Sequence, residues 1–249
     1  MADGRDAAPN PALGSLEWLV GAWDVSGPEI LLRPADAREG GEPMKGQVLF
    51  VHGGGEGAHA ADGRLAASLR EAMGDDLGVR YPKMPGEDAP EHGAWRGRIS
   101  EELTRMSGEV ILVGHSLGAS ILLKYLSEEE PEKPIAGVFL LAAPFWGAAD
   151  WEVEEYELRE NFASKLPEGL PVSLYHGRDD EVVPFEHLAL YAKKLPHATV
   201  RELGGRGHQF GDDLSDLARD IGEILSGARA ERTAATARER RPRQPEEDA

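Results

Sequence analysis

A serine stands between two glycines in residues 114–118 (GHSLG), at the spacing G-x-S-x-G. An apolar segment at 110–114 precedes it, and residues 119–126 (ASILLKYL) follow it with helical spacing. In this setting of strand, turn and helix the serine occupies a tight turn, and the two glycines avoid collisions with the neighbouring strand and helix. The turn also aims the amino end of the helix at an oxyanion forming on a substrate. The pattern therefore indicates a nucleophilic Ser116, and the alternative is a tight turn that happens to hold a serine.

A serine hydroxyl is a weak nucleophile, so it needs a base and an acid that orients the base. Two later loops that contain glycine supply these residue types, with Asp180 in residues 177–184 (GRDDEVVP) and His208 in residues 204–210 (GGRGHQF). The chain order serine, aspartate, histidine is the order typical of this motif. Among eight histidines, only His208 lies in a glycine-rich loop after the last predicted strand, so we expect it to be the base.

The acid has alternatives. Asp179 and Asp180 are adjacent, and we favour Asp180 because Asp179 would point the other way and could cap the turn. A solvated acidic turn is the other interpretation of this pair. Asp150, which follows the fourth predicted strand, is a further alternative for the acid.

A carbonyl carbon attacked by serine develops an oxyanion, which two N–H donors would stabilise. Leu117, the residue after the nucleophile, is expected to supply one donor, and Gly53 or Gly54 in the loop 52–55 (HGGG) is expected to supply the other. The same loop formally matches a dinucleotide fingerprint, G-x-G-x-x-A from residue 53. The next predicted strand brings no acid for a ribose, so we expect no cofactor.

Apolar runs alternate with helical patterns through the middle of the chain. Strands are predicted at residues 46–52, 77–81, 110–114, 135–143, 171–176 and 199–203. Helices are predicted at about 60–73, 92–106, 117–128, 184–195 and 212–226. This alternation predicts an α/β fold, a mostly parallel sheet of about six strands with helices on both faces. Functional loops would then gather at the carboxyl ends of the strands.

Composition excludes several kinds of partner. The chain has 249 residues, 41% of them hydrophobic, which predicts a packed core. Its net charge of −18 would repel phosphate backbones and anionic lipids, so we expect neither a nucleic-acid nor a membrane partner. There is no cysteine, hence no thiolate metal site or cysteine nucleophile, and we expect no metal. The first residues lack a secretion signal, which predicts a cytoplasmic protein.

The two ends differ from the middle in composition. Residues 1–45 are rich in Ala, Gly, Pro and Asp and predict either an arm or an edge hairpin. Residues 227–249 have almost no large apolar side chain and predict a disordered, charged tail. We therefore expect one catalytic domain over residues 46–226.

The motifs FVHGGG, VGHSLG, HGRDDEVVP and GRGHQF together resemble those of the α/β-hydrolase superfamily, and in particular of the small serine hydrolases related to retinoblastoma-binding protein 9. The resemblance covers about residues 46–226. It implies a compact α/β-hydrolase fold and a Ser-His-Asp serine hydrolase carried by Ser116, His208 and Asp180, with esterase-like activity. The HGGG loop departs from the pattern expected in the nearest relatives and looks more like that of esterases.

Substrate choice is expected to depend on residues 145–168, which leave the fourth predicted strand at the same sheet edge and form a short lid. Aromatic residues there either line an acyl or aryl pocket or cover exposed core, and the candidate pocket residues are His115, Phe145, Trp146, Trp151 and Tyr156. Six acids and one arginine lie between residues 150 and 160. Their field predicts a preference for neutral or cationic esters or amides over anionic ones, unless these acids simply form a solvated helix face.

The sequence as a whole predicts a serine hydrolase that cleaves a small-molecule carboxylic ester or amide through an acyl-enzyme. Acyl transfer to an acceptor other than water would use the same residues. The alternative from another class is a non-catalytic module of the same fold that binds a ligand or a protein, although nothing in the sequence indicates a protein partner.

Overall fold

The computed structural model describes residues 46–74, 77–148 and 151–239. The predicted arm or hairpin of residues 1–45 lies outside them. Six strands form one sheet in the order β2-β1-β3-β4-β5-β6, and every neighbouring pair is parallel. The strands are β1 (Gly46–Val51), β2 (Gly78–Arg80), β3 (Glu109–His115), β4 (Ile135–Leu141), β5 (Val172–Gly177) and β6 (Thr199–Leu203). The prediction of a parallel six-stranded sheet is confirmed.

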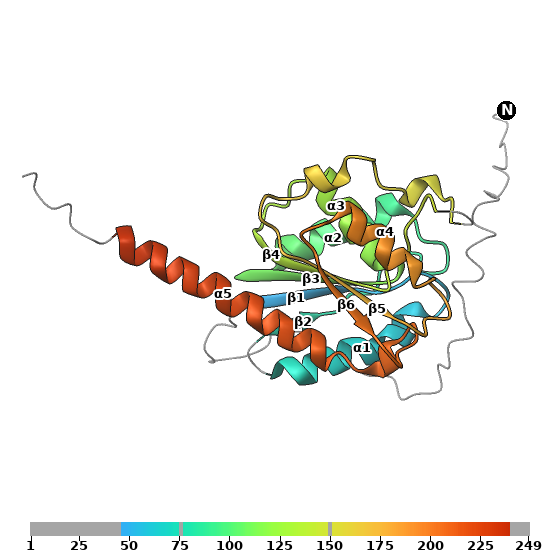
Figure 1. Cartoon of the computed structure of the whole chain (residues 1–249), viewed down its shortest axis with the longest axis horizontal. Helices are drawn as coiled ribbons and strands as arrows, with labels where there is room; N and C mark the ends of the chain where they lie inside the picture. The colour runs from blue at the N-terminus through green and yellow to red at the C-terminus, as the bar shows by residue number, and fades with distance from the viewer. Residues whose placement is uncertain (1–45, 75–76, 149–150, 240–249) are drawn as a thin grey trace, which may run out of the picture.

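Helices cover both faces of this sheet (Figure 1). They are α1 (Ala58–Met73), α2 (His92–Arg105), α3 (Leu117–Glu128), α4 (Glu186–Lys194) and α5 (Ser215–Glu239). Helices α2, α3 and α4 pack on one face, and α1 and α5 pack together on the other. Short 3-10 turns lie at η3 (Glu154–Tyr156), η4 (Phe162–Lys165) and η5 (Phe210–Asp212).

Strand β3 shows why a strand of this sheet can be a continuous apolar run in the sequence. Val110 and Leu112 face the core under α2, α3 and α4, whereas Ile111 and Val113 face the core under α1 and α5. All four side chains are fully buried. A parallel sheet with both faces covered needs apolar residues at successive positions rather than at alternate ones.

The last helix differs from the sequence-based expectation. Helix α5 continues to Glu239, so the prediction of a disordered tail from residue 227 is corrected as far as that residue. Residues 227–239 (GARAERTAATARE) are rich in alanine, arginine and glutamate, which have high helix propensity. A helix that packing has already nucleated extends at little cost through such residues. Residues 240–249 lie outside the described part of the chain.

In the described part of the chain, no helix is both long enough and apolar enough to cross a membrane.

Candidate active site

The serine of the G-x-S-x-G motif lies on the turn between β3 and α3. Ser116 has φ 51° and ψ −124°, a backbone conformation that is strained for a residue with a side chain. Its N–H donates to the Leu141 carbonyl (2.8 Å), which ties the turn to the end of β4. Only 3% of the residue is exposed, and its hydroxyl makes no hydrogen bond to any residue that the structure describes. Ser116 is therefore held by its backbone at the carboxyl edge of the sheet.

The two glycines of the motif are required by close backbone contacts. A Cβ on Gly118 would overlap the carbonyl oxygens of His52 and Val51, at the end of β1. A Cβ on Gly114 would lie 2.6 Å from the Ala119 Cα, in the first turn of α3. These contacts confirm that larger residues would collide with the neighbouring strand and helix.

The structure brings His208 and Asp180 together. The His208 Nδ1 lies 3.0 Å from Oδ1 and 2.9 Å from Oδ2 of Asp180, and neither side chain is more than 1% exposed. The loops that carry them are joined directly, since the Asp179 N–H donates to the Arg206 carbonyl (3.1 Å). Asp179 itself is exposed, so of the two adjacent aspartates only Asp180 faces the histidine. Asp150 lies outside the described residues.

Asp180 is surrounded by donors. Its Oδ1 accepts the N–H groups of Val182 (2.9 Å) and Val183 (2.8 Å), and its Oδ2 lies 3.2 Å from the His176 Nε2. Burial raises the pKa of Asp180, but the hydrogen bonds from His176 and His208 outweigh it and hold the pKa well below its usual range. The carboxylate is therefore ionised and fixed in orientation.

His208 is held as a neutral imidazole. Burial lowers its pKa, the hydrogen bond with Asp180 raises it, and the charge of His115 lowers it again. The net direction is downward, which favours the unprotonated form at neutral pH. A buried, neutral histidine oriented by a carboxylate is suited to accept a proton.

The structure distinguishes between Gly53 and Gly54, the two alternatives predicted for the second oxyanion donor. The Gly53 N–H donates to the buried Asp62 Oδ2 (2.8 Å), so it is not available to a substrate. Within the described residues, the N–H groups of Gly54 and Leu117 have no protein acceptor. These residues are in contact, because a Cβ on Gly54 would lie 2.6 Å from the Leu117 Cδ2. Of the two glycines proposed from the sequence, only Gly54 has an N–H that no acceptor among the described residues takes up.

His115 is part of a second buried pair that the sequence did not reveal. Its Nδ1 lies 2.8 Å from the Asp62 Oδ2, and its Nε2 lies 3.0 Å from the His208 carbonyl oxygen. The rings of His115 and His208 are 4.6 Å apart between centroids. Since His115 is 1% exposed and bonded at both nitrogens, it does not line a substrate pocket as the sequence suggested. The sequence signal for Asp62 was present, an acid on the apolar face of α1 between Ala58 and Leu65, but it points to no partner.

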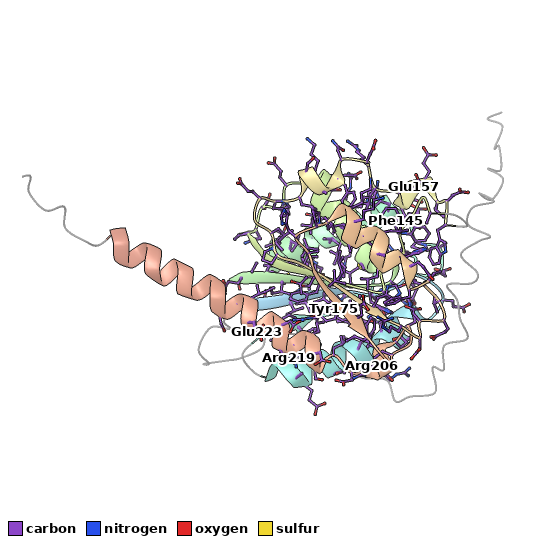
Figure 2. The ribbon with its side chains drawn as sticks, in the orientation of Figure 1. Phe145, Glu157, Tyr175, Arg206, Arg219 and Glu223 are labelled. Atoms are coloured by element: carbon purple, nitrogen blue, oxygen red, sulfur yellow. The ribbon has the colours of Figure 1, made fainter. Side chains whose placement is uncertain are left out.

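The aromatic residues predicted to line a pocket pack mostly against each other. Trp146 contacts Trp151 and Tyr156, with ring centroids 5.5 and 5.0 Å apart, and all three belong to the core next to α3. The Tyr156 hydroxyl donates to the Pro90 carbonyl (2.5 Å). These contacts favour the core-covering role of the segment. Phe145 is half-buried and lies on the α4 side of the sheet, opposite the side of Tyr175 and Arg219 (Figure 2).

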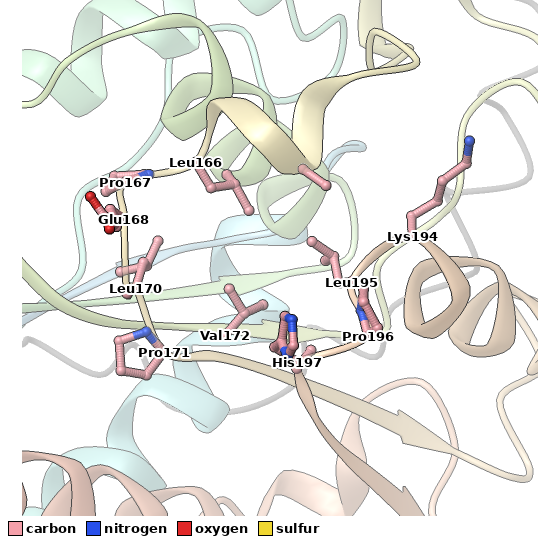
Figure 3. Close-up of a pocket in the computed structure, with 13 residues that line it drawn as sticks. Leu166, Pro167, Glu168, Leu170, Pro171, Val172, Lys194, Leu195, Pro196 and His197 are labelled. Carbon is pink, nitrogen blue, oxygen red and sulfur yellow. The ribbon is translucent and has the colours of Figure 1, made fainter.

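A separate hollow of about 440 Å³ lies between η4, the start of β5 and the end of α4 (Figure 3). Leu170, Pro171 and Val172 line one side, and Leu195, Pro196 and His197 line the other. These residues precede or begin β5 and β6, so the hollow lies at the amino edge of the sheet. Asp180 and His208 follow the same strands at the opposite edge, so this hollow does not serve Ser116.

Among the described residues, no group of three or more His, Asp or Glu side chains is arranged to hold a metal ion.

Fold and motif together define a class, an α/β hydrolase with a serine on the turn after the third strand. The family model described as serine hydrolase matches residues 66–213, more than half of the chain. The chain therefore belongs to the serine hydrolase family. A comparison with curated proteins finds no match.

Solved structures support the same fold. The ydeN gene product from B. subtilis is similar with a TM-score of 0.61 and 19% identity, over 73% of this chain and 99% of that one. Est1E from Butyrivibrio proteoclasticus has a TM-score of 0.56 and 18% identity, over 77% and 90% of the two chains. SOBER1 from Arabidopsis thaliana has a TM-score of 0.52 and 16% identity, over 73% and 97%. At these identities the likeness shows the fold, and the predicted α/β-hydrolase fold is confirmed.

Proposed function

We propose that this serine hydrolase cleaves carboxylic esters, or amides, of small molecules by way of an acyl-enzyme on Ser116. The observation that carries the proposal is the buried hydrogen bond between His208 and Asp180, at the sheet edge where Ser116 lies on a strained turn. A non-catalytic module would need none of these groups in this arrangement. Membership of the serine hydrolase family supports the same reaction class, and so does the similar fold of the solved esterase PE8 (TM-score 0.51, 21% identity).

In the proposed first step His208 Nε2 takes the hydroxyl proton as the Ser116 Oγ attacks the carbonyl carbon of the substrate. Asp180 keeps the proton of the imidazole on Nδ1 and stabilises the imidazolium that forms. His208 then returns the proton to the leaving alcohol or amine, and the acyl group stays on Ser116. Water, activated by His208 in the same way, attacks the acyl-enzyme and releases the acid. Each of the two steps consumes and returns one proton at His208.

The oxyanion of each tetrahedral intermediate would bind to the N–H groups of Leu117 and Gly54. Leu117 is the first residue of α3, so its N–H lies at the positive end of the helix dipole. Because these donors are fixed by the backbone, they need no rearrangement as the negative charge forms.

Hydrolysis of a short-chain aryl ester by single-residue variants tests the proposal. Ser116→Ala and His208→Ala are each expected to lower kcat/KM by about 10⁴-fold or more, because each removes a group that takes part in bond making. Ser120→Ala is the matched control, since Ser120 lies one turn further along α3 and its hydroxyl donates to the Pro144 carbonyl (2.9 Å). A folded Ser116→Ala variant with the activity of the wild type would overturn the proposal.

A further inference from the structure

Asp62 is an ionised side chain at a buried, otherwise apolar position, where packing alone gives no reason for a carboxylate. It lies on the buried face of α1 among Ala58, Leu65 and Leu69, and only 1% of it is exposed. Burying a carboxylate is costly unless donors satisfy it. Here three donors do: Oδ2 accepts the Gly53 N–H (2.8 Å) and lies 2.8 Å from the His115 Nδ1, while Oδ1 accepts the Gln209 Nε2 (3.0 Å).

Each of the three partners of Asp62 is adjacent in sequence to a residue of the proposed active site. Gly53 precedes the proposed oxyanion donor Gly54, His115 precedes the nucleophile Ser116, and Gln209 follows the base His208. Gly53 and Gln209 lie in the loops after β1 and β6, and His115 is the last residue of β3. A single carboxylate on α1 thus joins the three segments whose relative position decides catalysis.

We propose that Asp62 is a positioning residue for the hydrolytic site, which holds the oxyanion loop through Gly53, the nucleophile turn through His115 and the base loop through Gln209. The inference rests on the proposed function of Ser116 and His208. Asp62 touches neither of their reacting atoms and acts only through its neighbours.

The protonation of His115 completes the arrangement. Both of its ring nitrogens face oxygen acceptors, Asp62 Oδ2 and the His208 carbonyl, so both must carry protons and the ring is a cation. Burial lowers the pKa of His115, but the charge of Asp62 and the hydrogen bond to it outweigh burial, and the pKa is raised. The pair is therefore neutral overall, and His115 holds the base loop by the backbone of His208 itself.

The variant Asp62→Asn removes the charge with little change of shape. Gln209 can turn its amide over, because its Oε1 has no hydrogen-bond partner among the described residues and would accept from the introduced amide. His115 would then lose its counter-ion and one proton, so one of its two hydrogen bonds is lost. The nucleophile, the base and the oxyanion donors should all still be present in this variant, but their positions should no longer be fixed.

We expect Asp62→Asn to lower kcat for a neutral aryl ester by about 10- to 100-fold, the loss that a misplacement of reacting groups by about 1 Å produces. KM should change by less than about threefold, because misplaced donors and base weaken the transition state more than the bound substrate. A boronic acid that forms a tetrahedral adduct with the active serine should bind more weakly by about the same factor as the loss of kcat.

The matched control is Asp220→Asn. Asp220 is also a buried aspartate, 6% exposed, on the neighbouring helix α5, and it binds the Tyr175 hydroxyl (2.5 Å) and the Arg201 Nε (2.9 Å). Its partners have no place in the proposed site, so Asp220→Asn should leave kcat unchanged even where it lowers stability. An equal loss of kcat in both variants would overturn the inference, because general destabilisation would then explain it.

Gln209→Ala gives a second test that does not depend on Asp62→Asn folding well, since it removes only the contact at Oδ1. We expect a loss of kcat of several-fold, at most about tenfold, with KM unchanged. Turnover by the wild type keeps the two proposals apart. If the wild type hydrolyses the ester and Ser116→Ala does not, but Asp62→Asn and Gln209→Ala match the wild type, only the positioning role fails. If the folded wild type neither hydrolyses esters nor binds the boronic acid, the proposed function fails and the positioning role fails with it.

Discussion

Two buried aspartate–histidine pairs lie next to each other at the carboxyl edge of the sheet. They consist of the same two residue types, but we assign them different roles. In one pair, Asp180 and His208 both come from loops, and the carboxylate lies 2.9 Å from the His208 Nδ1. In the other, Asp62 comes from a helix and His115 from the last residue of a strand, at 2.8 Å. The two rings are 4.6 Å apart.

The difference lies in the second nitrogen of each histidine. The His115 Nε2 meets the backbone carbonyl of His208, so the ring stays doubly protonated and cannot exchange protons with a substrate. The proposed mechanism assigns the His208 Nε2 to the Ser116 hydroxyl, which can give up a proton. Both histidines have an acid partner, so the surroundings of the second ring nitrogen decide whether the histidine can carry a proton or only form a structural ion pair.

Loss of the acid partner of His208 should have the strongest effect on activity. Asp180→Asn should lower kcat/KM by about 10⁴-fold, since the amide no longer fixes the His208 tautomer or stabilises the imidazolium. Asp62→Asn should cost far less, because His208 keeps its acid. The measurement is the kcat/KM ratio of the two variants for one neutral ester. Similar losses of kcat/KM in both variants would mean that the two pairs do not have these different roles.

Removal of the His115 charge should change the pH dependence. The His115 cation lowers the pKa of His208, so in His115→Gln that pKa should rise. Activity needs neutral His208 and is lost as the pH falls through its pKa, so the acid limb of the kcat/KM profile should move to higher pH. Asp180 and Asp62, the other charges that act on His208, remain in place.

The control for this profile is His197→Gln, which removes an exposed histidine at the amino edge of the sheet. It should leave the acid limb where it is in the wild type. An unmoved limb in His115→Gln would show that the second pair does not act on the first through its charge.

The smallest effect concerns charges outside both pairs. Glu152, Glu154 and Glu155 are exposed on the segment after β4, as the acidic composition of that segment suggested. We expect a neutral ester to be turned over a few-fold faster than an anionic ester with the same acyl chain, and the ratio to shrink at high salt because surface charges are screened. Equal rates at low salt would contradict a role for this field in substrate choice.

Much of the fold and part of the site follow from local sequence. The central strands β1, β3 and β4 are readable because each contains an apolar run. The serine turn is readable because Gly114 and Gly118 stand two residues on either side of Ser116, where a Cβ would collide with α3 or with the end of β1. Asp180 is distinguished from Asp179 locally as well, since its carboxylate accepts the N–H groups two and three residues later.

The second pair could not be predicted in this way. Asp62 is 53 residues from His115 and 147 from Gln209, and no spacing rule links them. For the same reason the sequence leaves Gly53 and Gly54 equivalent, and only the distant Asp62 distinguishes them. The full length of α5 does not follow from burial, because residues 227–239 have almost no large apolar side chain and are helical through their propensity.

The assignment of Ser116 as the nucleophile is tested by labelling the intact chain with a fluorophosphonate and locating the label by mass spectrometry. Trypsin should release residues 106–124 (MSGEVILVGHSLGASILLK), which contain three serines that fragmentation can distinguish. We predict a single addition at Ser116 in the wild type and in Ser120→Ala, and none in Ser116→Ala or His208→Ala. A label on another residue, or none on the folded wild type, would contradict the assignment of Ser116 as the nucleophile.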